Sequence, residues 1–457
     1  MPIIKTPIKT LNQPSAKMEK FFDWGLGFAV AVTVFFQFYI PLPGGVININ
    51  LADPFAIMSL ILVSFKAIHF RRLPVWKVRD FNLALVIISL LLLFGFVRGW
   101  FYIGVTQWAL GGRLIGWLVL LAYLSVGYVV VARKGNHGMH QFSVILICTA
   151  ACVIIFNMSI RLLAHWGFDT GMALSPNFEG FASNRNAFAF QLLAIITLIL
   201  GYSKAYARYQ LTSVYLRYAS LGTILFGVLL VGLFWTGSRA GIGVGLILLL
   251  SAWVSRFADR KLVEKAVITA VILWVSMWFA AIVPSLLDAL INLVTALINA
   301  LTEGTSIAGA LKDASIHIKD IPVQSQLSNE GSNHERLATF THAINLWKQS
   351  PLFGTGLGVF IAKSPSWFGH PQVVHNSALW VLAEFGLVGI GAFCWIFYKL
   401  CRYVWLTKVM LPSQRSLLML LVVFIVFSLA HEIFYQRIFW LVLGALLAKP
   451  FANKANA

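Results

Sequence analysis

Twelve separate runs of apolar residues constrain the fold of this chain more than any other feature. They fall at 21–40, 53–70, 81–97, 114–132, 141–157, 187–203, 218–235, 240–255, 266–283, 377–398, 416–430 and 438–448. Hydrophobic residues make up 59% of the chain and charged residues 11%, whereas soluble domains average about 45–50% and about 25%. A soluble enzyme is therefore excluded. At ~20 apolar residues per membrane-spanning helix, the sequence predicts an all-α polytopic membrane protein with about twelve transmembrane helices.

The basic residues predict the orientation of these helices. The chain holds 35 Lys and Arg residues against 16 Asp and Glu residues. If the N-terminus lies in the cytoplasm, 24 of the 35 fall in cytoplasmic segments, as the positive-inside rule requires. Both termini are then cytoplasmic. The first apolar run has no small-residue cleavage site behind it, so we expect it to be retained as a span.

Eleven basic residues face outward in this arrangement, against the rule. They are Arg98, Arg113, Arg161, Arg185, Arg239, Lys312, Lys319, Arg336, Lys348, Lys363 and Arg437. A charge at membrane depth costs about 2.5 kcal/mol or more unless it is paired or hydrated. Some of these side chains can simply extend to the outer headgroups. Arg239 follows the tight break Thr236-Gly237-Ser238 and has little lipid to extend past. Several outward guanidinium groups predict an anion site, with a phosphate-bearing lipid as the natural ligand.

One long outer segment divides the chain into three parts. Residues 1–283 hold the first nine spans, 284–376 form a large outer loop with helices, and 377–457 hold the last three spans. The polar residues of 285–301 share one helical face, which predicts a helix lying in the membrane interface. Residues 304–331 are small and polar and predict a mobile loop. A capping-box pattern at Ser332 predicts a helix that ends near Pro351.

Histidine and glycine provide further candidates in this outer loop. His375 lies where the loop re-enters the membrane, and an imidazole there can accept a proton near neutral pH. A hydrogen-bonded interfacial histidine is the alternative. His334, His370 and His431 are weaker candidates, and no histidine pattern predicts a metal site. The glycines at 354, 356 and 358 follow no predicted strand and indicate a flexible hinge rather than a phosphate loop.

Four short motifs resemble those of the O-antigen ligases, within the O-antigen ligase/polymerase superfamily. His375-Asn376 is followed after nine residues by Gly386-Leu387-Val388-Gly389, which matches the spacing of that family. Ser-Arg-Ala-Gly at 238–241 and Ser-Asn-Arg-Asn at 183–186 are similar to further family segments. The fourth match is Arg336 with the Pro-Leu-Phe-Gly-Thr-Gly-Leu-Gly stretch at 351–358.

This resemblance implies a reaction and a place for it. Such proteins transfer a glycan from undecaprenyl pyrophosphate to a sugar hydroxyl of lipid A–core, at the periplasmic face of the bacterial inner membrane. It also implies a glycosyltransferase-C-like fold, no cofactor, no nucleotide sugar and no required metal. Arg185, Arg239 and Arg336, with Asn376, would bind the pyrophosphate. His375 would activate the acceptor, and direct attack would invert the anomeric centre. Glu179, Glu384 and Glu432 stay open as covalent nucleophiles.

Two other classes of function remain open at this point. An O-antigen or exopolysaccharide polymerase, or a protein O-glycosyltransferase, would use the same donor and the same motifs. A secondary transporter would place charges near the membrane midplane and often has two related halves. Here the unusual charges gather at the outer face and no halves are visible, so the glycosyltransferase is favoured. Partners are expected to be the lipid-linked donor, the lipid acceptor and membrane lipids, without nucleic acid.

Overall fold

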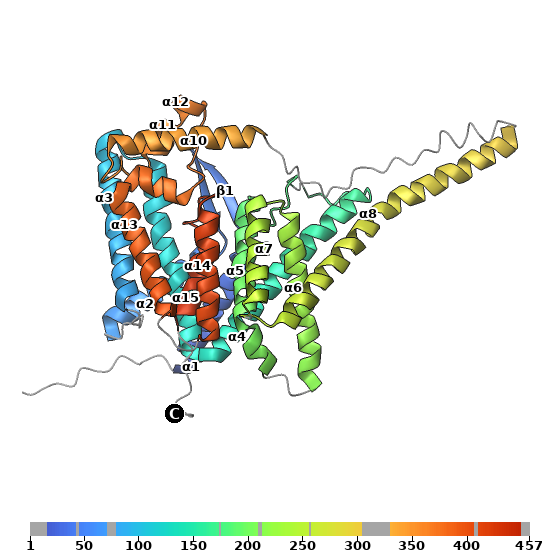
Figure 1. The fold of residues 1–457 in the computed structure, drawn as a ribbon, viewed down its shortest axis with the longest axis horizontal. Coiled ribbons are helices and arrows are strands. Elements are labelled where there is room, and N and C mark those ends of the chain that lie inside the picture. The colour runs from blue at the N-terminus through green and yellow to red at the C-terminus, as the bar shows by residue number, and fades with distance from the viewer. Residues whose placement is uncertain are drawn as a thin grey trace, which may run out of the picture.

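The protein is a bundle of helices with an additional layer of short helices across one end (Figure 1). The computed structural model describes residues 16–42, 45–70, 79–172, 175–208, 213–255, 257–303, 330–405 and 410–448. The main part of the bundle consists of α1 (Ala16–Thr33), α2 (Asp53–Phe70), α3 (Arg79–Ile103), η1 (Trp108–Ile115), α4 (Gly116–His165), α5 (Arg185–Arg208), α6 (Ser213–Trp235), α7 (Arg239–Val254), α8 (Arg260–Glu303), α13 (Ser377–Trp405), α14 (Pro412–Ser428) and α15 (Arg437–Leu447). The end layer consists of α10 (Glu330–Gln349), α11 (Val359–Lys363) and α12 (Pro365–Phe368).

The predicted apolar runs are all helical over most of their length. Six of the described helical segments are long and apolar enough to cross a membrane, and six more apolar helices are shorter. The protein is therefore an all-α, multi-pass membrane protein. The fourth and fifth runs both lie in α4, which changes direction at Gly135, a residue with φ +58°.

The first apolar run ends earlier than the sequence predicts. α1 stops at Thr33, and a β-hairpin of β1 (Gln37–Leu42) and β2 (Gly45–Asn50) follows. The strands are antiparallel and pair Gln37 with Asn50. A short apolar run does not distinguish a strand from a helix by hydrophobicity alone. The aromatic and β-branched residues beside a Pro-Gly turn were the available signal for the hairpin.

α8 continues through the position where we expected a separate interfacial helix to begin. Residues 285–301 are helical as predicted, but they extend the same 44-residue helix without a break at Pro284. A proline lacks the N–H that would bond the carbonyl four residues earlier, here that of Ala280. The indole nitrogen of Trp166 donates to this carbonyl at 3.1 Å, and the ring of His165 contacts the Ala281 carbonyl at 2.8 Å. Side chains from α4 and its C-terminus thus stabilise the helix across the proline.

The helix of the outer loop also begins earlier than predicted. α10 starts at Glu330, so Ser332 lies inside it rather than at its cap. An acidic residue in the first turn is favourable next to the helix dipole, which the capping-box pattern did not take into account. The helix ends at Gln349, as the proline at 351 predicts. Of the predicted mobile loop, residues 304–329 lie outside the described residues.

The glycine-rich stretch after α10 is a fixed clamp, and the prediction of a flexible hinge is wrong. α13 is kinked at Gly386, whose φ is +65°. The kink frees the carbonyls of Ala383 and Glu384, which accept hydrogen bonds from the N–H groups of Thr355 and Gly356, each at 3.0 Å. Beyond the kink, the N–H groups of Leu387 and Val388 donate to the carbonyls of Pro351 and Leu352 at 2.9 and 3.0 Å. We call residues 351–357 and the kink at Gly386 the loop clamp.

Replacing Gly386 by alanine should destabilise the protein, whereas the same change at Gly391 should not. A Cβ atom at Gly386 would lie 2.5 Å from the backbone of Leu352, and the backbone there is one that only glycine adopts without strain. Strain and overlap together predict a loss of about 2–5 kcal/mol. Gly391 lies in the same helix with open space around it, so alanine there should add slightly to stability. Thermal unfolding of both variants in detergent measures the difference, and equal midpoints would contradict the clamp.

α15 lies at the centre of the bundle and packs closely against α4. Every residue from Ile438 to Leu447 is buried. The two helices approach so closely that a Cβ atom at Gly127 would lie 2.0 Å from the Leu441 carbonyl oxygen, and one at Gly444 would lie 2.1 Å from that of Leu124. This packing fixes the start of α15, and the preceding segment at 429–436, against the outer end of the bundle.

Candidate functional site

Three helices begin at the same end of the bundle, beneath the layer of α10, α11 and α12 (Figure 1). These are α5, α7 and α13, and the residue at or just before each start is a predicted site residue: Arg185, Arg239 and His375. The N-terminus of a helix carries a partial positive charge. Three such ends beside cationic side chains form a region suited to anions.

Each of the three helices has a polar cap that belongs to one of the sequence motifs. The side chain of Asn184 accepts hydrogen bonds from the N–H groups of Asn186 and Ala187. Ser238 accepts one from Gly241 at 3.1 Å, and Asn376 accepts one from Leu379 at 2.9 Å. The polar residue in each motif therefore fixes where a helix starts, and this places the neighbouring arginine or histidine.

The starts of α5 and α7 are packed directly on each other. A Cβ atom at Gly241 would lie 2.7 Å from the Cβ of Ala189, so only glycine allows this approach. Ala189 is one turn beyond Arg185, and Gly241 is two residues beyond Arg239. Ser183, just before the α5 cap, has φ +53°, an uncommon conformation for a residue with a side chain. The local backbone is thus held in a specific shape beside Arg185.

The three predicted arginines share one property: none has a hydrogen-bond or ion-pair partner among the described residues. Arg239 and Arg336 are exposed, and Arg185 is half-buried. Arg336 lies in the second turn of α10. Guanidinium groups without partners at the end of a helix bundle are available to a ligand.

Two other outward arginines are bound to neutral groups of the protein. Arg98 donates to the hydroxyl of Ser350 at 2.7 Å. Arg161 donates to the carbonyls of Ser175 and Asn177, both at 2.7 Å. These contacts attach the C-terminal ends of α3 and α4 to neighbouring loops, which is a structural role.

The remaining two outward arginines form buried ion pairs. Arg437 makes two hydrogen bonds to Asp53, at 2.7 and 2.8 Å, and a third to the carbonyl of Asn48 at 3.0 Å. Arg113 also pairs through both nitrogens, with Glu432. Such bidentate pairs offset the guanidinium charge. The sequence left the role of these residues open, and the structure shows that each is neutralised within the protein.

Arg113 is enclosed by aromatic rings as well as by its carboxylate. It is 3% exposed, and its guanidinium carbon lies 4.5–4.7 Å from the ring centres of Trp108, Trp380 and Tyr435. It projects from η1, a π-helical segment, and such segments often occur near functional sites. We call Arg113, Glu432 and these three rings the arginine cage.

The carboxylates that the sequence left open as nucleophiles are held within the protein. Glu432 belongs to the arginine cage. Glu384 is 2% exposed and accepts a hydrogen bond from the Trp380 indole at 2.7 Å. Glu179 lies near Arg161, whose charge it offsets. Glu384 and Glu432 are thus both hydrogen-bonded to groups of the protein itself.

His375 is half-buried at the end of the loop that precedes α13. The amide nitrogen of Gln372 lies 2.9 Å from its Nε2 atom. Because an amide nitrogen only donates, this contact corresponds to the tautomer in which Nε2 is unprotonated. Burial lowers the pKa of His375 below its ordinary value, and the charge of Arg336 lowers this pKa further, while Glu432 and Glu335 act the other way. The ring is therefore neutral near pH 7.

The segment between α14 and α15 is attached to the start of α13. The side-chain amide of Asn376 donates to the Leu429 carbonyl at 2.6 Å. The hydroxyl of Ser377 donates to the His431 carbonyl at 3.2 Å and accepts from the N–H of Ile433 at 3.0 Å. Asn376, which we expected to bind pyrophosphate, thus uses both ends of its amide within the protein.

This attachment brings His431 to the site, a residue that the sequence ranked low. Burial lowers the pKa of His431 to about 3, and the charges of Arg336, His375 and Arg185 contribute to the shift. Arg185, Arg336, His375 and His431 are therefore close enough to affect one another electrostatically. We call these four residues the anion cluster. No described contact joins Arg239 to it, although Arg239 lies at the same end.

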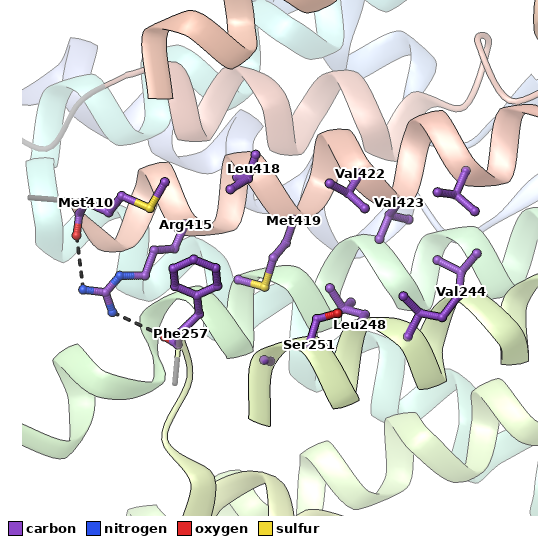
Figure 2. A pocket seen from close by; sticks show the side chains of 13 residues that line it. Val244, Leu248, Ser251, Phe257, Met410, Arg415, Leu418, Met419, Val422 and Val423 are labelled. Carbon is purple, nitrogen blue, oxygen red and sulfur yellow. Dashed lines mark hydrogen bonds between the residues drawn. The ribbon is translucent and has the colours of Figure 1, made fainter. Parts of the chain in front are cut away.

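The apolar groove that the structure shows lies elsewhere, between α7 and α14 (Figure 2). It has a volume of about 150 Å³ and is lined mainly by aliphatic side chains, among them Val244, Leu248 and Val423. Arg415 lies at one end of it, where it donates to the carbonyls of Phe257 and Met410 at 3.4 and 3.1 Å. The groove contains none of the anion cluster, so we place no chemistry in it.

Comparison with known proteins supports the resemblance seen in the motifs. None of the curated proteins searched matches the chain. Residues 224–394 match a protein-family model described as O-antigen ligase. The matched region runs from α6 to the middle of α13 and includes Arg239, Arg336, His375 and the loop clamp. The chain thus carries, over residues 224–394, a region similar to the O-antigen ligase family.

Proposed function

We propose that this protein transfers a glycan from undecaprenyl pyrophosphate to a sugar hydroxyl of lipid A–core. The reaction takes place at the periplasmic face of the bacterial inner membrane, with both chain termini in the cytoplasm. The protein then acts as an O-antigen ligase in lipopolysaccharide biosynthesis, with a glycosyltransferase-C-like arrangement of about twelve spans. The match of residues 224–394 to the O-antigen ligase family model supports a membrane glycosyltransferase, a lipid-linked glycan substrate and a lipid acceptor in general.

One observation carries the proposal. Of the seven outward arginines with described side chains, the four outside the motifs are bound within the protein, and the three in the motifs have no partner there. A membrane protein does not keep three such charges at one end without a use for them, because each is costly near the lipid. A pyrophosphate group supplies the matching negative charge.

The proposed step needs only groups that this chain provides. The acceptor hydroxyl displaces Gln372 from Nε2 of His375 and gives its proton to that nitrogen. Its oxygen attacks the anomeric carbon, and the bond from that carbon to the pyrophosphate oxygen breaks. The electron pair leaves with undecaprenyl pyrophosphate, and the anomeric configuration inverts. Arg185, Arg239 and Arg336 stabilise the charge that grows on the leaving group, which is the task that a metal ion performs in other phosphate-releasing enzymes.

The test uses purified full-length protein in detergent, with undecaprenyl-pyrophosphate-linked glycan as donor and EDTA present throughout. We expect glycan to appear on lipid A–core, and we expect none when lipid A–core is omitted. Longer glycan chains on the donor lipid would instead identify a polymerase, and glycan on an added acceptor protein would identify a protein O-glycosyltransferase. If transfer is absent in EDTA and returns when Mg²⁺ is added in excess, the metal-independent mechanism is overturned.

Substituting the partnerless arginines should weaken activity without weakening the fold. Arg336→Ala removes a cation from the anion cluster. We expect the donor KM to rise and kcat to fall, so that kcat/KM decreases by about 10- to 1,000-fold. Arg336→Lys should restore only part of it, because an ammonium group does not bind phosphate through two nitrogens. Lys348→Ala, in the exposed last turn of α10, is the matched control. Initial rates at varied donor concentration measure the effect, and equal losses in both variants would contradict the role of Arg336.

A further inference from the structure

His431 combines deep burial with ring nitrogens that have no partner. It is 8% exposed, yet neither ring nitrogen is hydrogen-bonded to a described residue. Its contacts are made by other atoms: its ring lies 5.0 Å from that of Phe427, and its N–H donates to the Phe427 carbonyl at 3.0 Å. The ring nitrogens are not among the fully buried polar atoms that lack a partner, so they can be reached from outside the protein. A ring that is packed in place, with accessible nitrogens that no described residue bonds, is available to a ligand.

The position of His431 indicates which ligand that is. The Ser377 bridge holds the His431 backbone against the start of α13, two residues after His375. The groups that face it electrostatically are Arg336, His375 and Arg185, which are two cations and a neutral ring, with no carboxylate among them. Only an anion gains from being placed between these groups. The phosphate oxygens of the donor fit this environment, whereas a neutral sugar hydroxyl would gain nothing from the two cations.

The protonation state of His431 defines what it does there. Because its pKa lies near 3, the ring is neutral across the physiological range and does not transfer protons at pH 7. A neutral imidazole still carries one N–H group, which donates a hydrogen bond. His431 therefore differs in role from His375, which contacts Gln372 and has the unprotonated nitrogen that a base needs.

We propose that His431 is a donor-binding residue, whose ring N–H donates a hydrogen bond to a phosphate oxygen of the polyprenyl pyrophosphate. This rests on the function proposed above and adds to it a residue that lies outside the matched family region. His431 then binds the leaving group, and His375 accepts the proton of the acceptor hydroxyl.

Two substitutions at His431 separate hydrogen bonding from packing. His431→Phe keeps a ring on Phe427 and removes the N–H, and His431→Gln keeps an N–H donor without the ring. His342→Phe is the control, because His342 is half-buried in α10 and likewise lies against an aromatic ring, that of Trp367 at 4.4 Å. The experiment uses full-length protein in detergent and measures the binding of undecaprenyl pyrophosphate alone, then the donor and acceptor KM and kcat.

We expect His431→Phe to weaken undecaprenyl pyrophosphate binding and raise the donor KM by about 10- to 100-fold, the effect of one hydrogen bond to a charged group. The acceptor KM should stay constant, His431→Gln should recover most of the binding, and His342→Phe should match the wild type. Equal losses in the Phe and Gln variants, or a loss confined to the acceptor KM, would overturn the proposal.

The binding measurement needs no acceptor, so it tests His431 even if the transfer reaction is not the one proposed. Normal binding by His431→Phe together with normal transfer by the wild type would refute the role of His431 and leave the proposed function intact. If the wild type binds undecaprenyl pyrophosphate through His431 but transfers glycan to no acceptor, the role of His431 is supported and the proposed function is refuted. A wild type that does not bind undecaprenyl pyrophosphate would refute both.

Discussion

His375→Ala should reduce kcat by about 10²–10⁴-fold, the usual contribution of a general base. The acceptor hydroxyl is a poor nucleophile until its proton moves, and Nε2 of His375 is the unprotonated nitrogen positioned by Gln372. The donor should still bind, because the arginines remain. The measurement is the single-turnover rate of glycan transfer with the donor saturating, together with the affinity for undecaprenyl pyrophosphate.

His370→Ala provides the control for this result. His370 lies in the same loop and is exposed, and its one ring contact among the described residues is with Phe368, at 6.5 Å. Its removal should leave the rate unchanged. A similar rate for His375→Ala and His370→Ala would refute the assignment of His375 as the base.

The pH profile gives an independent check on His375. A base works in its deprotonated form, so the rate falls as pH drops through the pKa. Burial and the charge of Arg336 place this pKa below its ordinary value. We therefore expect kcat/KM to be level around pH 7 and to decline only in more acidic solution. Arg336→Gln removes the cation, raises the pKa of His375 and should move the decline to higher pH, whatever it does to donor binding.

Glu432→Ala should destabilise the protein by about 3–5 kcal/mol, because it leaves the Arg113 guanidinium charged and buried without its carboxylate. The side chains of the pair are 4% and 13% exposed, and three aromatic rings lie against the guanidinium group, so water replaces the carboxylate poorly. Thermal and denaturant unfolding in detergent measure the loss. Activity should fall only as far as the folded fraction falls.

Arg239→Ala is the informative comparison, since it removes an arginine that has no partner. We expect its unfolding midpoint to match the wild type while transfer is lost. The double variant Arg113→Met/Glu432→Leu should regain much of the stability lost in Glu432→Ala, because apolar residues of similar size replace a buried pair well. If Glu432→Ala unfolds like the wild type, the ion pair is not a structural element of the bundle.

The sequence predicts the helical architecture well because the bilayer imposes a long apolar run on every span. It fails where tertiary contacts override local signals. Pro284 marks a break in the sequence, yet α8 continues because side chains from 165 and 166 bond the carbonyls there. The glycines at 354 and 356 suggest flexibility, yet hydrogen bonds to the kink in α13 fix their backbone.

In the candidate site, too, the sequence predicts some residues and misses those that depend on tertiary contacts. Arg185, Arg239, Arg336 and His375 are visible in the sequence because a charge or an imidazole at the edge of an apolar run is costly and needs a reason. The sequence could not distinguish these arginines from those bound within the protein, because the partners of Arg98 and Arg437 lie 252 and 384 residues away in the chain. His431 belongs to no motif, and only the folded chain brings it to the anion cluster. Gln372 also belongs to no motif, although it lies just three residues before His375.

These long separations have a consequence for how the protein is made. Arg98 and Arg113 enter the membrane early, but Ser350 and Glu432, their partners, are 252 and 319 residues further along the chain. At about 5–20 residues per second, the ribosome needs roughly 13–60 s to supply them. During that time the first helices must reside in the bilayer with two unpaired guanidinium groups. Biogenesis of the N-terminal half therefore depends on insertion machinery or headgroups that shelter these charges until the C-terminal helices arrive.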